Sequence, residues 1–347
     1  MDCSHEGNDV PAPPIKRLAP WAGSPAILVD VKTVLVTGAA GFIGSHLVDA
    51  LLARGERVRG LDNFATGRAS NLAHVREQIE FFEASLLDRD ALARACEGVE
   101  VIFHQAALPS VPRSVMDPRT SHVANLEGTF ELLEAARAAG VKRVVFAASS
   151  SAYGNQPGFP RVETMVPMPI APYPVQKMAG ELYMKSYWQV YGMETVCLRY
   201  FNIFGPRQVP DSPYSGVMAR FILQLQKGER PVIFGDGEQG RDFTYIANAV
   251  HANLLASDAP AANVAGRVFN VATGVRHTLN ETYDVIASLL KTEIKPEYGP
   301  ERAGDVKNSE ASIEAAREAF GYAPTVGFEE GLQRTVDWYQ ADFTKAV

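Results

Sequence analysis

The spacing of apolar positions along the chain changes repeatedly and predicts strands that alternate with helices. The first signal is VKTVLVTG, residues 31–38, a short run rich in β-branched residues that is typical of a buried parallel strand. A glycine-rich turn and an amphipathic pattern follow as far as Gly55, and the run RVRGLD then ends at Asp62. The pattern therefore predicts a strand, a tight turn, a helix and a second strand.

The same alternation continues beyond residue 62. Further buried-strand patterns are VEVIFHQAA (residues 99–107), VKRVVFAASSSAYG (141–154) and GRVFNVATG (266–274). We expect His104, inside the first of these runs, to be a hydrogen-bonded core histidine. Strands separated by helical patterns favour an α/β fold, in which a doubly wound parallel sheet of the Rossmann type carries a smaller C-terminal α/β lobe.

The first turn has the glycine spacing of a dinucleotide site. Gly38 allows the tight turn, Gly41 lets the backbone approach a pyrophosphate, and Gly44 lets the helix pack closely on the strand. The helix N-terminus then directs free N–H groups at the phosphates. Asp62 ends the second strand, where a carboxylate binds ribose hydroxyls and repels a 2′-phosphate, so NAD is favoured over NADP. A glycine turn without a ligand is the alternative.

Composition narrows the class of protein. The chain has 347 residues, of which 46% are apolar and 21% charged, as is ordinary for a soluble globular protein. Its formal net charge of −7 argues against nucleic acid as a partner, because phosphate binding needs a basic face. The cysteines, Cys3, Cys96 and Cys197, are far apart and predict neither a metal site nor a disulfide. Without a membrane-length apolar run or a signal region, we expect a cytoplasmic protein with no membrane partner.

A helix start bounded by prolines carries further candidate chemistry. In APYPVQKMAGE, residues 171–181, Tyr173 stands four residues before Lys177, so both lie on one helix face. Free tyrosine titrates at about 10, so a general base needs its phenolate to be favoured. The nearby ammonium group favours it, and the positive nicotinamide of bound NAD is expected to favour it further. A capped surface helix is the alternative. Ser149, Ser150 and Ser151 end a predicted strand, so we expect them to open into the cofactor crevice.

Together these motifs resemble the extended short-chain dehydrogenase/reductase family, and within it the nucleotide-sugar 4-epimerases. The resemblance covers nearly the whole chain from residue 31. It rests on TGAAGFIG, LDNF, HQAA, SSSAYG, PYPVQK, LRYFNIFGPRQ, SPYSGVMARFI, GDGEQGRDFTYI and ERAGDVKNSEAS. It implies an NAD cofactor, a UDP-sugar substrate, and a homodimer built on residues 118–140 and on the helix that carries Lys177.

The resemblance also implies roles for individual residues. Tyr173 is the base, Lys177 its helper and Ser149 the hydroxyl that bridges to the sugar, which is oxidised at C4 and reduced again on its other face. The expected NAD contacts are Gly38, Gly41, Phe42, Ile43, Gly44, Asp62, Asn63, Ser85, Leu86, Gln105, Ala106, Ala107, Asn125, Tyr173 and Lys177. The expected substrate contacts are Ser110, Ser149, Ser150, Ser151, Asn202, Gln208, Val217, Arg241, Arg302, Asp305 and Ser309.

Several reactions occur within the resembled family. Dehydratases typically follow their catalytic threonine with an Asp–Glu pair, whereas Ser150 and Ser151 stand here and are poor acids. This favours a 4-epimerase. A UDP-glucuronate 4-epimerase, a dehydratase or a decarboxylase remains an alternative, as do an NADPH-dependent reductase and, from another class, a non-catalytic NAD-binding regulator. The regulator would be expected to lose one of the three catalytic residues.

The sugar is suggested by positions at which related enzymes differ. Ser309 is small and leaves room for an acetamido group, and Gln208 agrees, so UDP-N-acetylglucosamine and UDP-N-acetylgalactosamine are the leading substrates. UDP-glucose and UDP-galactose are retained, because Pro109 stands where N-acetyl-specific enzymes often have glycine. Ser85 stands where an aspartate often meets adenine and is expected to bind it more weakly.

The domain boundaries follow from these segments. We expect residues 1–30 to be a poorly ordered extension. The NAD-binding domain is expected over residues 31–200 with a returning segment at about 245–280. The UDP-sugar-binding lobe is expected over residues 201–244 and 281–347.

Overall fold

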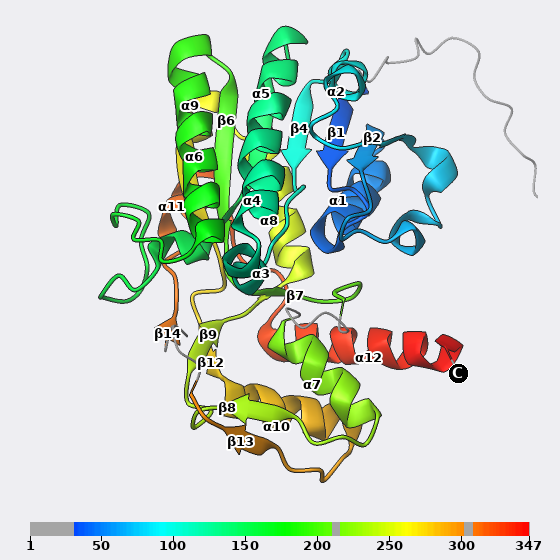
Figure 1. Cartoon of the computed structure of the whole chain (residues 1–347), viewed down its shortest axis with the longest axis vertical. Coiled ribbons are helices and arrows are strands. Elements are labelled where there is room, and N and C mark those ends of the chain that lie inside the picture. The colour runs from blue at the N-terminus through cyan, green and yellow to red at the C-terminus, as the bar shows by residue number, and fades with distance from the viewer. Residues whose placement is uncertain (1–30, 210–215, 302–307, 347) are drawn as a thin grey trace, which may run out of the picture. The chain divides into compact units, whose positions relative to one another are not determined.

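Seven parallel strands form the large sheet of the computed structural model, which describes residues 31–209, 216–301 and 308–346 (Figure 1). Across the sheet the strands are β11 (Arg267–Val271), β6 (Glu194–Tyr200), β5 (Arg143–Ser149), β4 (Val101–His104), β1 (Thr33–Thr37), β2 (Arg57–Asp62) and β3 (Glu80–Glu83). The strand order reverses between β1 and β4, which is where such sheets open a ligand crevice. The predicted extension over residues 1–30 lies outside the described residues.

Helices cover both faces of this sheet, which confirms the doubly wound fold. Side chains alternate along each strand, so Val34 and Val36 of β1 enter one core and Leu35 enters the other. The first core is covered by α1 (Phe42–Ala53), α8 (Ile246–Asp258), α9 (Ala261–Val264) and α11 (Glu314–Phe320). The second is covered by α2 (Arg89–Cys96), α5 (Gly128–Ala138) and α6 (Pro172–Tyr191).

A smaller lobe has its own apolar core. Its helices are α7 (Val217–Gln226), α10 (Leu279–Leu290) and α12 (Phe328–Ala346). Its short strand pairs are β7 (Ile203–Phe204) with β10 (Thr244–Tyr245), β8 (Val232–Phe234) with β13 (Glu297–Gly299), and β9 (Gly240–Asp242) with both β12 (Arg276–Thr278) and β14 (Asn308–Ser309). In the part of the chain that is described, no helix is both long and apolar enough to cross a membrane.

One segment packs differently from the expected lobe boundary. The sequence assigns residues 281–347 to the smaller lobe, but Ile313, Ala316, Ala319 and Tyr322 join the first core of the large sheet beside Phe269. The Tyr322 hydroxyl donates to the Ala272 carbonyl at 2.8 Å. The cause is tertiary: β11 is an edge strand, and α11 covers its apolar face. The division into two functional domains stays a prediction.

The helix expected over residues 118–140 is interrupted. Following α3 (Val111–Met116), α4 (Pro118–His122) runs into a π-helical turn at Val123–Glu127 and then into α5. Asn125 lies in this turn and is buried, and its Oδ1 accepts a hydrogen bond from the Leu108 N–H at 2.7 Å. The turn therefore directs a side-chain amide at the loop that follows β4.

Candidate active site

The glycine turn lies at the switch point between β1 and β4. Gly38 has a φ of 68°, and a Cβ added there would lie 2.7 Å from the Ala106 nitrogen. A Cβ added at Gly44 would lie 2.1 Å from the Gly38 carbonyl oxygen. Both positions therefore exclude any side chain, because the chain turns tightly after β1 and α1 packs directly on the turn.

The residues around this turn fit a dinucleotide. Gly41 is the N-cap residue of α1 and makes no side-chain capping hydrogen bond, and the first turn of α1 has no acidic residue. The free N–H groups of that turn therefore suit an anionic diphosphate. Asp62 is buried, and its carboxylate accepts from the N–H groups of Ala40 at 3.0 Å and Phe64 at 2.7 Å. Burial raises the pKa of Asp62, while these hydrogen bonds oppose the rise and fix the carboxylate at the end of β2.

Three other predicted cofactor residues use their polar groups within the protein. The Gln105 amide donates to Asn253 Oδ1 at 3.3 Å and accepts from the Tyr200 hydroxyl at 3.2 Å. Ser85 Oγ accepts from the Leu87 N–H at 3.2 Å, and the Asn125 amide holds Leu108. These contacts fix the loops that follow β3 and β4, and any direct contact with the cofactor stays a prediction.

The remaining predicted cofactor residues lie around the same crevice. Asn63 is exposed at the end of β2, and Leu86 is buried against Gly128. Phe42 and Ile43 begin α1, and Ala106 and Ala107 follow β4; all four are half-buried. His104 is a core histidine as expected, because its ring nitrogens bond the hydroxyls of Thr37 at 2.8 Å and Thr129 at 2.9 Å.

The structure brings Ser149, Tyr173 and Lys177 together. Ser149 ends β5, and Tyr173 lies in the first turn of α6, which begins at Pro172. The Ser149 hydroxyl lies close enough to the Tyr173 hydroxyl to lower its pKa. Lys177 is buried one turn further along α6, and its Nζ donates to the Ala147 carbonyl at 2.8 Å. The set is arranged for proton transfer, and its catalytic roles stay predictions.

Burial governs the ionisation of Tyr173 and Lys177. Burial raises the pKa of the Tyr173 hydroxyl to about 12, although the nearby Ser149 hydroxyl opposes the rise. Burial lowers the pKa of Lys177 to about 8, although the Glu181 carboxylate opposes the fall. Lys177 by itself does not lower the pKa of Tyr173. A phenolate at Tyr173 needs further positive charge, as a bound nicotinamide would supply.

The two following serines form a short hydroxyl network. Ser150 and Ser151 begin the 3-10 turn Ser150–Tyr153 and are half-buried. Ser151 Oγ lies 2.8 Å from Ser149 Oγ, and the Ser151 N–H donates to Ser149 Oγ at 3.2 Å. This network orients the Ser149 hydroxyl at the end of β5.

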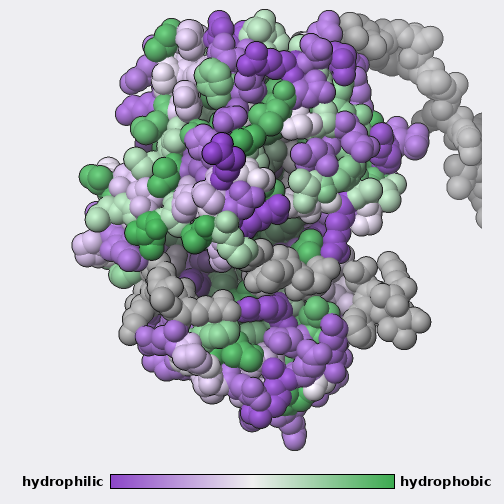
Figure 2. Space-filling model, in the orientation of Figure 1, coloured by the Kyte–Doolittle hydropathy of each residue, from purple (hydrophilic) through white to green (hydrophobic). Residues whose placement is uncertain are grey.

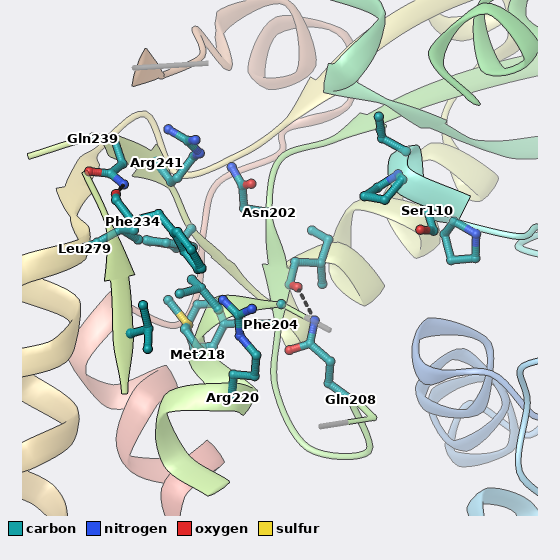
Figure 3. Close-up of a pocket in the computed structure, with 18 residues that line it drawn as sticks. Ser110, Asn202, Phe204, Gln208, Met218, Arg220, Phe234, Gln239, Arg241 and Leu279 are labelled. Atoms are coloured by element: carbon teal, nitrogen blue, oxygen red, sulfur yellow. Dashed lines mark hydrogen bonds between the residues drawn. The ribbon is translucent and has the colours of Figure 1, made fainter. Parts of the chain in front are cut away.

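A cavity of about 470 Å³ lies between the large sheet and the smaller lobe, where Figure 2 shows the surface hollowed. Five predicted substrate residues line it, and Figure 3 shows most of them: Ser110, Asn202, Gln208, Val217 and Arg241. Ser309 does not line it, but is paired in register with Arg241 across β14 and β9. Arg302 and Asp305 lie outside the described residues.

The cavity also holds residues that the sequence did not single out. Arg220 of α7 extends into it, as does Arg241 of β9, and Phe234, Gln239 and Leu279 line the same wall (Figure 3). Among the described lining residues, charge comes from the two arginines, although the chain as a whole is acidic. Arg220 stands one helical turn after Val217, and that spacing is the signal that could have identified it.

A helix links the cavity to the catalytic set. Ser110 is the N-cap of α3, and Ser110, Val111 and Pro112 line the cavity. Ser114 of the same helix accepts a hydrogen bond from the Tyr173 N–H at 3.1 Å. The first turn of α6 and the cavity wall are therefore held by one short element.

Comparisons with known proteins agree with this geometry. Residues 34–272 match the model of the NAD dependent epimerase/dehydratase family. UDP-glucose 4-epimerase of Mycolicibacterium smegmatis is 42% identical over 310 residues, which are 88% of this chain and 98% of that protein.

Solved structures are similar over the same range. The UDP-N-acetylglucosamine 4-epimerase of Methanobrevibacter ruminantium, in complex with UDP-N-acetylmuramic acid, has a TM-score of 0.86 and 39% identity, over 90% of this chain and 99% of that one. The UDP-glucose 4-epimerase of Thermus thermophilus, in complex with NAD, has a TM-score of 0.80 and 39% identity, over 89% and 99%. The chain therefore belongs to the NAD-dependent epimerase/dehydratase family and is an NAD-dependent enzyme of the epimerase type.

Proposed function

We propose that this protein is a UDP-sugar 4-epimerase that interconverts UDP-N-acetylglucosamine and UDP-N-acetylgalactosamine, with UDP-glucose and UDP-galactose as further substrates. The observation that carries the proposal is the position of Tyr173 at the start of α6: its N–H donates to Ser114 of α3 at 3.1 Å, and α3 also lines a cavity with two arginines. The Ser149 hydroxyl at the end of β5 lies close enough to lower the pKa of Tyr173. Such a cavity suits a nucleoside diphosphate, and the hydroxyl pair suits an alcohol that is oxidised beside it.

The side chains then have separate tasks. When bound, NAD supplies a reversible hydride acceptor. Tyr173 takes the proton of the sugar 4-hydroxyl and later returns it, while Ser149 orients that hydroxyl by a hydrogen bond. The Lys177 ammonium offsets the charge of the phenolate. Arg241 and Arg220 hold the diphosphate, whose two phosphates match the fork of a guanidinium group.

The preference for an N-acetylated sugar rests on Ser309. This half-buried residue on β14 is paired with Arg241 of the cavity wall, and its small side chain leaves room for an acetamido group. Ser309→Tyr should therefore lower kcat/KM for UDP-N-acetylglucosamine by about tenfold or more and change that for UDP-glucose less. Equal losses on both sugars would remove Ser309 as the determinant.

We also propose that the enzyme is a homodimer that is formed by α5 and α6. Exposed apolar side chains recur along one face of α6 at Val175, Leu182, Tyr183 and Val190. Phe130 of α5 extends this surface, with its ring 5.6 Å from that of Tyr183. A contiguous apolar stripe on two neighbouring helices suits an isologous contact with a second copy.

The proposed reaction is tested with purified protein and no added cofactor. UDP-N-acetylglucosamine and, separately, UDP-glucose are supplied, and proton NMR follows the anomeric signals of each sugar. A 4-epimer that forms without accumulation of NADH supports the proposal, and the faster substrate identifies the sugar. No product from either sugar, even with NAD supplied, would overturn it and point to a UDP-uronate substrate or to another reaction of the family.

A further inference from the structure

A buried ion pair lies directly behind Lys177. Glu181 stands one helical turn after Lys177 on α6, and its carboxylate accepts from Arg199 of β6 at 2.9 Å (Nε) and 2.7 Å (Nη2). The side chains of Arg199 and Glu181 are only 4% and 6% exposed. Two charges desolvated to this degree act strongly on any third charge nearby, because water does not screen them.

The pair lies between the helix that carries Tyr173 and Lys177 and the turn that follows Ser149. Glu181 shares its helix with Tyr173 and Lys177, whereas the Arg199 guanidinium lies 4.6 Å from the ring centroid of Tyr153. Tyr153 ends the 3-10 turn that begins directly after Ser149, and its hydroxyl donates to Asn270 Oδ1 at 2.7 Å. The pair therefore connects α6 to the segment that orients Ser149.

The other titratable groups around Lys177 are uncharged at neutral pH. His104 of β4 is neutral because burial, aided by the Lys177 charge, lowers its pKa to about 3. Cys197 of β6 is a thiol because burial raises its pKa well above the usual value, and burial likewise raises the pKa of Tyr173 to about 12. Glu181 and Arg199 are therefore the groups of this set that carry charge, and the Glu181 carboxylate raises the pKa of Lys177.

We propose that Glu181 and Arg199 are positioning residues that keep Lys177 charged at the pH at which the enzyme works. While the two are paired, their opposite charges largely cancel at Lys177, and the Glu181 carboxylate favours the ammonium form. Loss of Glu181 alone leaves a buried guanidinium that repels the ammonium, whereas loss of Arg199 alone leaves a carboxylate free to attract it. The effect of the pair on the protonation of Lys177 does not depend on the reaction, whereas its consequence for catalysis rests on the proposed function.

The two single variants are expected to shift the Lys177 titration in opposite directions, which makes the test specific. Glu181→Gln should move the titration of Lys177 to lower pH by about one unit or more, and Arg199→Met should move it to higher pH. The double variant Glu181→Gln/Arg199→Met should titrate near the wild type, because both charges are gone. A pair with a purely structural role would not shift the two single variants in opposite directions.

The titration is read directly by NMR of the full-length protein labelled with 13Cε-lysine. The Lys177 signal is assigned as the one that is missing in Lys177→Ala. Glu194→Gln is the matched control, because it breaks a second, partly buried ion pair with Arg143 (Nε–Oε2 2.9 Å). That pair lies at the start of β5 and β6, away from Ser149 at the end of β5. We expect no change in the Lys177 titration there. Shifts of the same sign in both single variants, or none in either, would overturn the proposal.

Enzyme kinetics provide the second measurement. The basic limb of the kcat profile for UDP-N-acetylglucosamine should move with the NMR titration, to lower pH in Glu181→Gln and to higher pH in Arg199→Met. If one single variant does not fold, the direction of the shift in the other still decides. If the NMR shifts have opposite signs but the protein epimerises neither sugar, the effect of the pair on Lys177 is supported and the proposed reaction is overturned. Failure of this inference is therefore distinguishable from failure of the proposed function.

Discussion

At the scale of single residues, Tyr173 is the group whose loss should separate chemistry from binding. Tyr173→Phe removes the hydroxyl that lies near Ser149 and keeps the ring. We expect turnover to fall by about 10²- to 10⁴-fold, because general-base catalysis contributes about that much. NAD content, measured after denaturation of the purified protein, should not change. Tyr183→Phe, at an exposed position of the same helix, is the control and should retain activity. A Tyr173→Phe enzyme with most of its turnover would disprove the assignment of the base.

Arg220 has a different expected signature because it lies in the cavity and not beside Ser149. Arg220→Ala should raise the KM for the UDP-sugar and the inhibition constant of UDP by about tenfold each, since a charge-assisted hydrogen bond is lost, and should change kcat little. Arg230→Ala is the control, because Arg230 is exposed and does not line the cavity. Unchanged UDP inhibition in Arg220→Ala would exclude Arg220 from the diphosphate site.

At the scale of elements, the junction of β1 and α1 is the most constrained part of the cofactor site. In Gly44→Ala the added Cβ would lie 2.1 Å from the Gly38 carbonyl oxygen, which is far too close. The helix α1 therefore has to move away from the turn. We expect a loss of roughly 1–3 kcal/mol in the free energy of unfolding and a clear loss of bound NAD. Gly327→Ala is the matched control, because an added Cβ there meets nothing within 4 Å. Chemical denaturation and NAD content measure the two effects. A stable Gly44→Ala protein that retains its NAD would contradict this account.

The elements also show what the sequence can and cannot predict. The second strand ends at Asp62 as expected, and α6 begins beside Tyr173, because buried parallel strands and proline-bounded helix starts leave strong local patterns. The π-helical turn at Asn125 was not foreseen, because one extra residue in a helix leaves no clear periodic signal. Arg220 is harder to predict for another reason: α7 has the pattern of an ordinary amphipathic helix, so the one-turn spacing from Val217 places Arg220 on the same face but does not show that a cavity lies there.

At the scale of the whole molecule, the catalytic set and the proposed dimer surface share one helix. Tyr173 and Lys177 lie at the start of α6, while Leu182 and Val190 are exposed further along it. The catalytic end of α6 is anchored by contacts within the chain, namely Tyr173 N–H to Ser114 and Lys177 to the Ala147 carbonyl. A second copy would therefore cover the exposed stripe without supplying any of these contacts.

Leu182→Glu tests the dimer, because Leu182 is 58% exposed in the middle of the stripe. A carboxylate there, brought against its own symmetry mate, adds like-charge repulsion and desolvation to the loss of apolar contact. We expect wild-type protein to elute as a dimer at micromolar concentration and Leu182→Glu as a monomer, by size-exclusion chromatography with light scattering. Val275→Glu introduces the same charge at a residue 53% exposed outside the stripe, in the turn before β12, and should remain dimeric. A monomeric wild type, or a Leu182→Glu protein as dimeric as Val275→Glu, would show that this face of α6 is not the interface.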